Sequence, residues 1–139
     1  MDHLLEKFSL NDGNDRLEAL SEVIFAFERA ELSGPAGDDV LAEILRFINY
    51  DSVSELETFI FAIGKHSSKH SVDMLLSLAP KITNERVAWQ YLIAYENIVG
   101  NSIVAEFIPA FDRIKFYANE TRTDGDASGK IRKALVRFC

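Results

Sequence analysis

The chain has 139 residues, of which 47% are hydrophobic and 11% aromatic, a size and composition that favour one folded domain with an apolar core over a disordered acidic chain. Its only cysteine is Cys139, which excludes an intrachain disulfide and any metal site built on paired cysteines. The formal net charge of −7 disfavours direct binding of nucleic acid, because a negative surface repels phosphate.

Apolar residues in the first third of the chain recur at intervals of three and four, which is the spacing of amphipathic helices. The first predicted helix carries its apolar stripe over residues 17–27 and stops at Gly34. The second carries a stripe over residues 40–48, and Asp38 or Asp39 is expected to cap it.

The middle of the chain continues with two further helices. The third is expected to begin at Asp51 or Ser52 and carries a stripe over residues 53–63. A shorter fourth helix follows through residues 72–79 and ends at Pro80, because proline interrupts the backbone hydrogen bonds of a helix.

The last third predicts three more helices. Thr83 is expected to cap a helix with its stripe over residues 87–98. Asn101 or Ser102 is expected to open a longer helix through residues 104–117, and Pro109 is expected to bend it. After a polar loop, residues 131–138 form the last amphipathic helix, and alternating strand-like patterns are absent from the sequence.

Part of the helical pattern repeats. An offset of 32 residues places segment 59–63 (Phe-Ile-Phe-Ala-Ile) over segment 91–95 (Tyr-Leu-Ile-Ala-Tyr), and an offset of 36 places segment 25–28 over segment 61–64. A period of this length made of two helices is typical of α-solenoids. Over roughly residues 14–119 the chain resembles HEAT or armadillo-type helical repeats.

This resemblance implies an all-α fold with a single helical-repeat domain over residues 1–139. The expected architecture is an α-solenoid of about three antiparallel helix pairs, with a C-terminal helix that caps the stack. The basic and apolar run 130–138 is assigned to that cap. An irregular helical bundle remains the structural alternative.

Charge is divided unequally along the chain. Residues 1–57 contain fourteen acidic and four basic residues, a net charge of −10, whereas residues 58–139 contain eight acidic and eleven basic residues, a net charge of +3. An acidic surface attracts cationic partners, so the first half predicts binding to a basic protein. The alternative is that these acids only keep a helical surface solvated.

The two histidines His66 and His70 are spaced four residues apart, as metal ligands on one face of a helix are. The neighbouring Gly64 and Ser67-Ser68 favour a turn instead, and no adjacent acid completes a ligand set. Both histidines are therefore expected to be ordinary surface residues.

Other motifs do not complete a chemical site. The sequence Gly64-Lys65-His66-Ser67 resembles the end of a phosphate-binding loop, but Phe59 occupies the position of its first glycine. Residues 124–129 resemble the start of a calcium loop, whose twelfth position requires Glu and is Leu135 here. We expect no enzyme activity, no catalytic residue, no cofactor and no bound metal.

The compartment is predicted from what the sequence lacks. Residues 1–7 do not resemble a signal peptide, and no window approaches the roughly 18 consecutive apolar residues of a membrane span. We expect a cytoplasmic protein with no membrane partner.

Small, acidic, helical proteins of this kind are similar to the immunity proteins of bacterial toxin systems, including contact-dependent growth inhibition. The resemblance implies a tight complex with a cationic toxin domain, often a nuclease, whose phosphate-binding residues would be covered by acidic side chains. If the second helix of each pair lines the concave face, Asp38, Asp39, Glu43 and Asp51 are expected on or beside that face, with Asp12, Asp15, Glu18 and Glu22 nearby. These eight acids are the expected partner-binding residues. The competing hypothesis is a HEAT-like protein-interaction scaffold or regulatory subunit without a toxin partner.

Overall fold

A computed structural model describes residues 5–6, 13–118 and 126–138 of the chain. Within these residues the secondary structure is helical and contains no strand, so the all-α class is confirmed. The elements are α2 (Gly13–Glu28), α3 (Gly34–Phe47), α4 (Val53–His66), α5 (Lys69–Leu78), η1 (Ala79–Lys81), α6 (Glu85–Ile98), η2 (Ala105–Phe107), α7 (Ile108–Ala118) and α8 (Asp126–Leu135).

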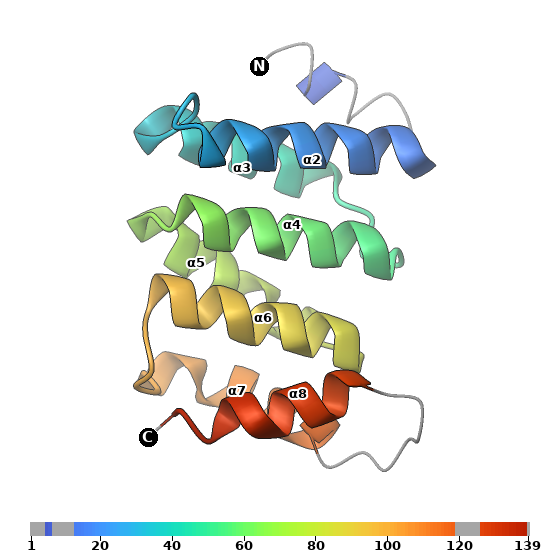
Figure 1. Ribbon diagram of the computed structural model, residues 1–139. Coiled ribbons are helices and arrows are strands. Elements are labelled where there is room, and N and C mark those ends of the chain that lie inside the picture. Colours follow the sequence, from blue (N-terminus) through green and yellow to red (C-terminus); the bar gives the residue numbers. More distant parts are fainter. Residues whose placement is uncertain (1–4, 7–12, 119–125, 139) are drawn as a thin grey trace.

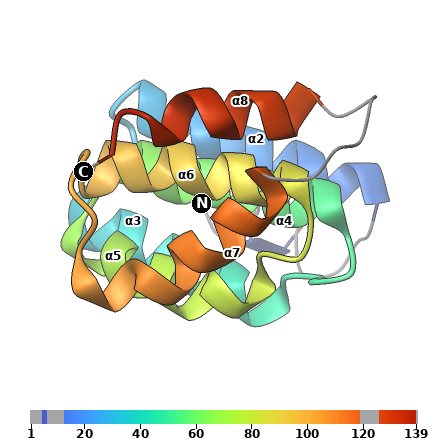
Figure 2. The same ribbon diagram turned by 90° about the horizontal axis from the view of Figure 1, so that it is seen from below.

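The α-helices form two layers (Figure 1). Helices α2, α4, α6 and α8 follow one another in one layer, and each packs directly on the next. Figure 2 shows α3, α5 and α7 in the second layer. Helices α4 and α6 begin 32 residues apart, which is the offset predicted from the sequence, whereas α2 and α4 begin 40 residues apart. This arrangement is compatible with a helical-repeat type.

The interface between the two layers is filled by aromatic and branched side chains. Tyr91 of α6 is fully buried, and its hydroxyl donates a hydrogen bond of 2.5 Å to the carbonyl of Leu75 in α5. Burial raises the pKa of this phenol well above its usual value. Tyr95 is also buried, and its hydroxyl donates to the carbonyl of Ser102 and accepts from the amide of Val104. These bonds fix α6 against α5 and against the segment before α7.

Helix starts follow capping chemistry. Ser52 caps α4 by accepting a hydrogen bond from the amide of Glu55, as predicted. The prediction of Thr83 as a cap is wrong by one residue, since Asn84 accepts from the amide of Val87 at the start of α6.

The predicted start of α3 is wrong. The helix begins at Gly34, with Pro35 in its first turn, where a missing amide hydrogen removes no helical bond. Its N-cap residue is Ser33, so Asp38 and Asp39 lie within the helix instead of capping it.

Pro109 also has a different place from the one predicted. It is the second residue of α7, directly after the short helix η2, instead of a bend within one long helix. A proline in the first turn of a helix costs no internal hydrogen bond. The sequence 104–117 therefore contains a 3-10 turn followed by a separate α-helix.

A buried ion pair ties α2 to α4. The guanidinium of Arg16 donates to both carboxylate oxygens of Glu55, at 3.1 and 2.7 Å, and also to the carbonyl of Phe47 at the end of α3. Glu55 in turn accepts a hydrogen bond from the amide of Asn49. The pair thus holds the α3–α4 connection against the first layer, and both charges are compensated where they are buried.

Candidate binding surface

The predicted partner-binding acids of α2 share one side of that helix. Asp15, Glu18 and Glu22 are exposed and spaced by three and four residues, which places them on one face. Asp12 lies outside the described residues. Phe25, three residues after Glu22, continues the same face and is 50% exposed.

Helix α3 carries a second, similar stripe. Asp39 is exposed, Glu43 is partly exposed and pairs with Arg46 at 3.1 Å, and Phe47 follows on the same face with 42% of its surface exposed. Asp51 is exposed in the turn between α3 and α4, where its amide bonds the side chain of Asn49. The predicted acids therefore divide between the two layers.

We define the α2–α3 acidic surface by the exposed or partly exposed acids on these two stripes, namely Asp15, Glu18, Glu22, Asp39 and Glu43. Both stripes end in an exposed phenylalanine, and an arginine guanidinium lies over each ring. Arg29 lies 5.6 Å from the centre of Phe25, and Arg46 lies 5.7 Å from the centre of Phe47. Aromatic and arginine side chains are the types that anchor protein interfaces. The sequence analysis did not identify Phe25 and Phe47 as surface residues, because each lies next to an apolar residue of a predicted helical stripe.

Asp38 differs from the other predicted acids because it is held inside the fold. Its side chain is 18% exposed, and its Oδ1 atom accepts a hydrogen bond of 2.6 Å from the hydroxyl of Ser68. The same Oδ1 lies 2.7 Å from Nε2 of His66. The bond from Ser68, with a smaller contribution from His66, lowers the pKa of the Asp38 carboxyl below its usual value, against the effect of burial. Asp38 is thus a fixed carboxylate that connects α3 to the α4–α5 turn.

The expectation that His66 is a surface residue is wrong. Its side chain is only 4% exposed and stacks on the ring of Phe27 in α2, with ring centres 4.7 Å apart. Gly37 makes room for it, since a Cβ atom there would lie 2.6 Å from Cε1 of His66. The sequence contained a signal for this burial, because His66 follows Ile63 and Phe59 by three and seven residues on the apolar stripe. His70, in contrast, is exposed as expected.

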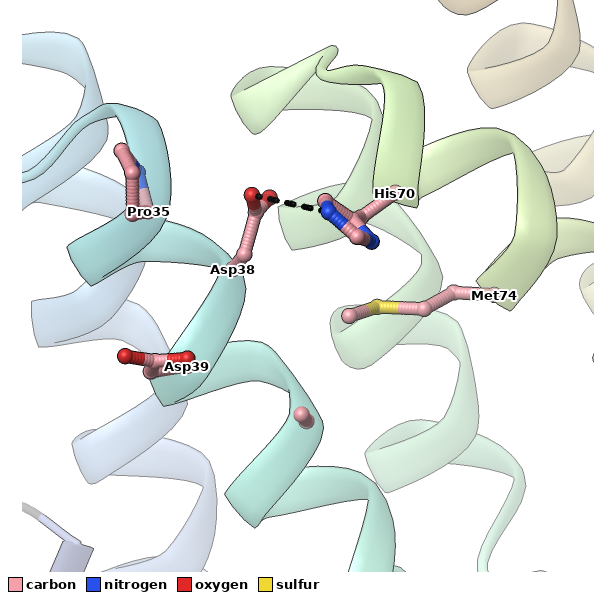
Figure 3. A pocket seen from close by; sticks show the side chains of 6 residues that line it. Pro35, Asp38, Asp39, His70 and Met74 are labelled. Carbon is pink, nitrogen blue, oxygen red and sulfur yellow. Dashed lines mark ion pairs between the residues drawn. The ribbon is translucent and has the colours of Figure 1, made fainter.

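A pocket of about 240 Å³ lies beside this cluster, between α3 and α5 (Figure 3). Asp38 points from α3 toward His70 of α5, with Oδ2 and Nε2 3.8 Å apart, and the side chain of Met74 extends from α5 beneath them. The six lining residues are Pro35, Asp38, Asp39, Ala42, His70 and Met74. The pocket thus adjoins the Asp39–Glu43 stripe of the α2–α3 acidic surface.

Ser68, His66 and Asp38 are the residue types of a hydrolytic triad, but their geometry is different. The serine hydroxyl and the histidine ring both bond the same oxygen of Asp38, whereas nucleophilic catalysis requires the hydroxyl to bond the histidine. Ser68 also caps α5 through the amide of Ser71. The cluster therefore connects helices and does not form an activated nucleophile.

The described part of the chain contains no group of three or more His, Cys, Asp or Glu side chains arranged to hold a metal ion. None of its helices combines the length and the apolar character needed to cross a membrane.

Comparison with protein families, curated proteins and solved structures finds no match to this chain.

Proposed function

We propose that this chain binds a basic protein through the α2–α3 acidic surface, and that the partner is a cationic toxin nuclease domain that the chain neutralises as an immunity protein. It acts by binding and not by catalysis. Its place of action is the cytoplasm, where an incoming nuclease would meet its nucleic-acid substrate.

The observation that carries the proposal is the pair of matching stripes on α2 and α3. Each has exposed or partly exposed carboxylates followed by an exposed phenylalanine under a guanidinium. Carboxylates steer a basic partner into contact, and desolvated aromatic rings supply the contacts that slow its release. Solvation alone accounts for the carboxylates, whereas the proposed function also uses the two exposed phenylalanines on the same stripes.

The partner class follows from charge complementarity. A nuclease holds the phosphates of its substrate with Lys and Arg side chains, so its active face is basic. A surface that presents carboxylates at helical spacing offers those side chains an alternative set of anions. Binding there would cover the substrate site and block the nuclease without any change in its fold.

A second candidate function is a protein-interaction scaffold, and a separate observation favours it. Ile108 and Phe116 of α7 are 50% and 62% exposed, and they lie in the second layer away from α2. Exposed apolar side chains of this size also mark interfaces. A scaffold would use this C-terminal region, whereas the immunity function uses the α2–α3 acidic surface.

The test begins with the protein that co-purifies with the chain from its native cell. That protein is purified alone and assayed for cleavage of DNA and RNA, with and without one equivalent of the chain. The proposal expects a basic nuclease whose activity is lost at a 1:1 ratio, with an association rate that falls as salt rises. A partner without nuclease activity, or a nuclease that remains active in the complex, would refute it.

A further inference from the structure

The lining of the pocket between α3 and α5 combines carboxylates with apolar surface. Helix α3 contributes Asp38 and Asp39 together with Pro35 and Ala42, and α5 contributes His70 and the thioether of Met74. A ligand that fits this lining combines a positive head with an apolar stem. Arginine and lysine side chains have this form, since their methylene stems pack on apolar surface while the charged head makes polar contacts.

Asp38 is prepared to receive such a head. Its Oδ1 atom already accepts from Ser68 and lies 2.7 Å from Nε2 of His66, which fixes the carboxylate in one orientation. Its Oδ2 atom lies 3.8 Å from Nε2 of His70, which is beyond hydrogen-bond distance. This oxygen faces the His70 imidazole but is too far from it for a hydrogen bond, so it can accept one from a ligand that enters beside the imidazole. Preorganisation of this kind lowers the entropic cost of binding.

We propose that this pocket is an anchor site for an arginine side chain of the basic partner. The inference rests on the proposed function and specifies its contact chemistry. Arginine fits better than lysine because its guanidinium presents five donors in a planar fork, so one donor can bond Oδ2 of Asp38 while the others remain available to neighbouring acceptors or water. The guanidinium is also more weakly hydrated than an ammonium group, so its transfer into a partly apolar pocket costs less.

The pocket can be tested without knowing the partner. The probe is N-acetyl-arginine methylamide, and the readout is the methyl NMR signal of Met74 in protein labelled at methionine methyl carbons. The chain has two methionines, Met1 and Met74, so assignment needs only one variant. We expect a saturable shift of the Met74 signal with a dissociation constant in the millimolar range, as is usual for a single small side chain.

Three comparisons make the result specific. The citrulline derivative has nearly the same shape without the charge, and the lysine derivative has the charge without the fork. Asp39→Asn should weaken arginine binding several-fold, whereas Asp73→Asn, which removes an exposed acid of α5 outside the pocket, should leave it unchanged. Equal shifts with citrulline or lysine, no shift with arginine, or equal losses in the two variants would overturn the proposal.

A pocket-filling variant separates this inference from the proposed function. Ala42 is exposed at the pocket, so Ala42→Trp can fill the space without changing the charge of the α2–α3 acidic surface. The affinity for the purified partner should fall about tenfold or more, as expected when an interface anchor is excluded. If Ala42→Trp binds as tightly as wild type, the arginine anchor is wrong while the immunity function stands. If no basic partner exists, the proposed function fails, and the arginine titration still decides whether the pocket binds the side chain.

Discussion

The imidazole of His66 and the carboxylate of Asp38 lie 2.7 Å apart at their Nε2 and Oδ1 atoms, and they join the end of α4 to α3. With Phe27 stacked on the imidazole, this contact connects three helices of the first two helix pairs. It also orients the carboxylate that lines the α3–α5 pocket. Asp38 is therefore expected to affect both the stability of this junction and binding at the pocket.

The Asp38 carboxylate makes stability depend on pH. Because the folded state lowers the pKa of Asp38, its stabilising effect is complete above the unfolded pKa of about 3.9 and is lost as pH falls through the folded value. Asp38→Asn should therefore be less stable than wild type near neutral pH, and the difference should shrink in acid. Urea unfolding of both proteins between pH 7 and pH 2 measures this difference, and a constant gap over that range would contradict the assignment.

Gly37 is expected to tolerate no larger residue. A Cβ atom there would approach His66 and Phe27 to 2.6 and 2.8 Å, so Gly37→Ala should destabilise the fold by about 1–3 kcal/mol through overpacking. Gly129→Ala is the matched control, because its Cβ would meet only Arg132, at 3.9 Å, within α8. That variant should be more stable than wild type by roughly 0.5–1 kcal/mol, since alanine favours helix. Thermal unfolding distinguishes the two, and equal shifts would refute the packing argument.

The buried pair Arg16–Glu55 should be far more sensitive than an exposed pair. Glu55→Ala leaves a buried guanidinium without its carboxylate and should cost about 3–5 kcal/mol in free energy of unfolding. Glu57→Ala removes the partly exposed partner of the exposed Arg86 and should cost no more than about 1 kcal/mol. Denaturant titration measures both values. Similar losses in the two variants would show that burial does not control the strength of these pairs.

Ala30, two residues after the end of α2, has a left-handed backbone with φ of 59°. This conformation is unfavourable for a residue with a Cβ atom by about 1–2 kcal/mol, and glycine adopts it freely. Ala30→Gly should therefore stabilise the protein by roughly 0.5–1 kcal/mol after the greater chain entropy of glycine is subtracted. A lower melting temperature for this variant would contradict the expected strain.

Local sequence signals were sufficient to predict the all-α class and most helices. The apolar stripes over residues 53–63 and 87–98 lie on α4 and α6, because three- and four-residue spacing reports directly on a buried helical face. The effect of Pro109 was less predictable. Proline breaks a helix interior but fits a first turn, and the sequence alone did not decide which situation applies at Pro109.

The candidate site could be predicted only in part. The acids of α2 and Asp39 of α3 were identified from charge and are exposed. The contact between Asp38 and His66 was not predicted, because it joins residues 28 positions apart and requires Gly37 to admit the imidazole. No local pattern encodes such a tertiary contact. The pocket depends on the same packing and was equally inaccessible from the sequence.

Charge reversal with matched variants tests whether the α2–α3 acidic surface neutralises a toxin. The first variant reverses three acids of that surface (Glu22→Lys, Asp39→Lys and Glu43→Lys). The control reverses three exposed acids elsewhere, with the same change in net charge (Asp73→Lys, Glu106→Lys and Asp112→Lys). Circular dichroism establishes that both variants remain folded.

The decisive measurement is the growth of cells that produce the co-purified partner together with each form of the chain. Wild type and the control variant should allow growth, whereas the variant reversed on the α2–α3 acidic surface should not, because it repels a cationic nuclease. Growth arrest in all three cultures, normal growth without the chain, or full protection by the reversed surface would each contradict the account.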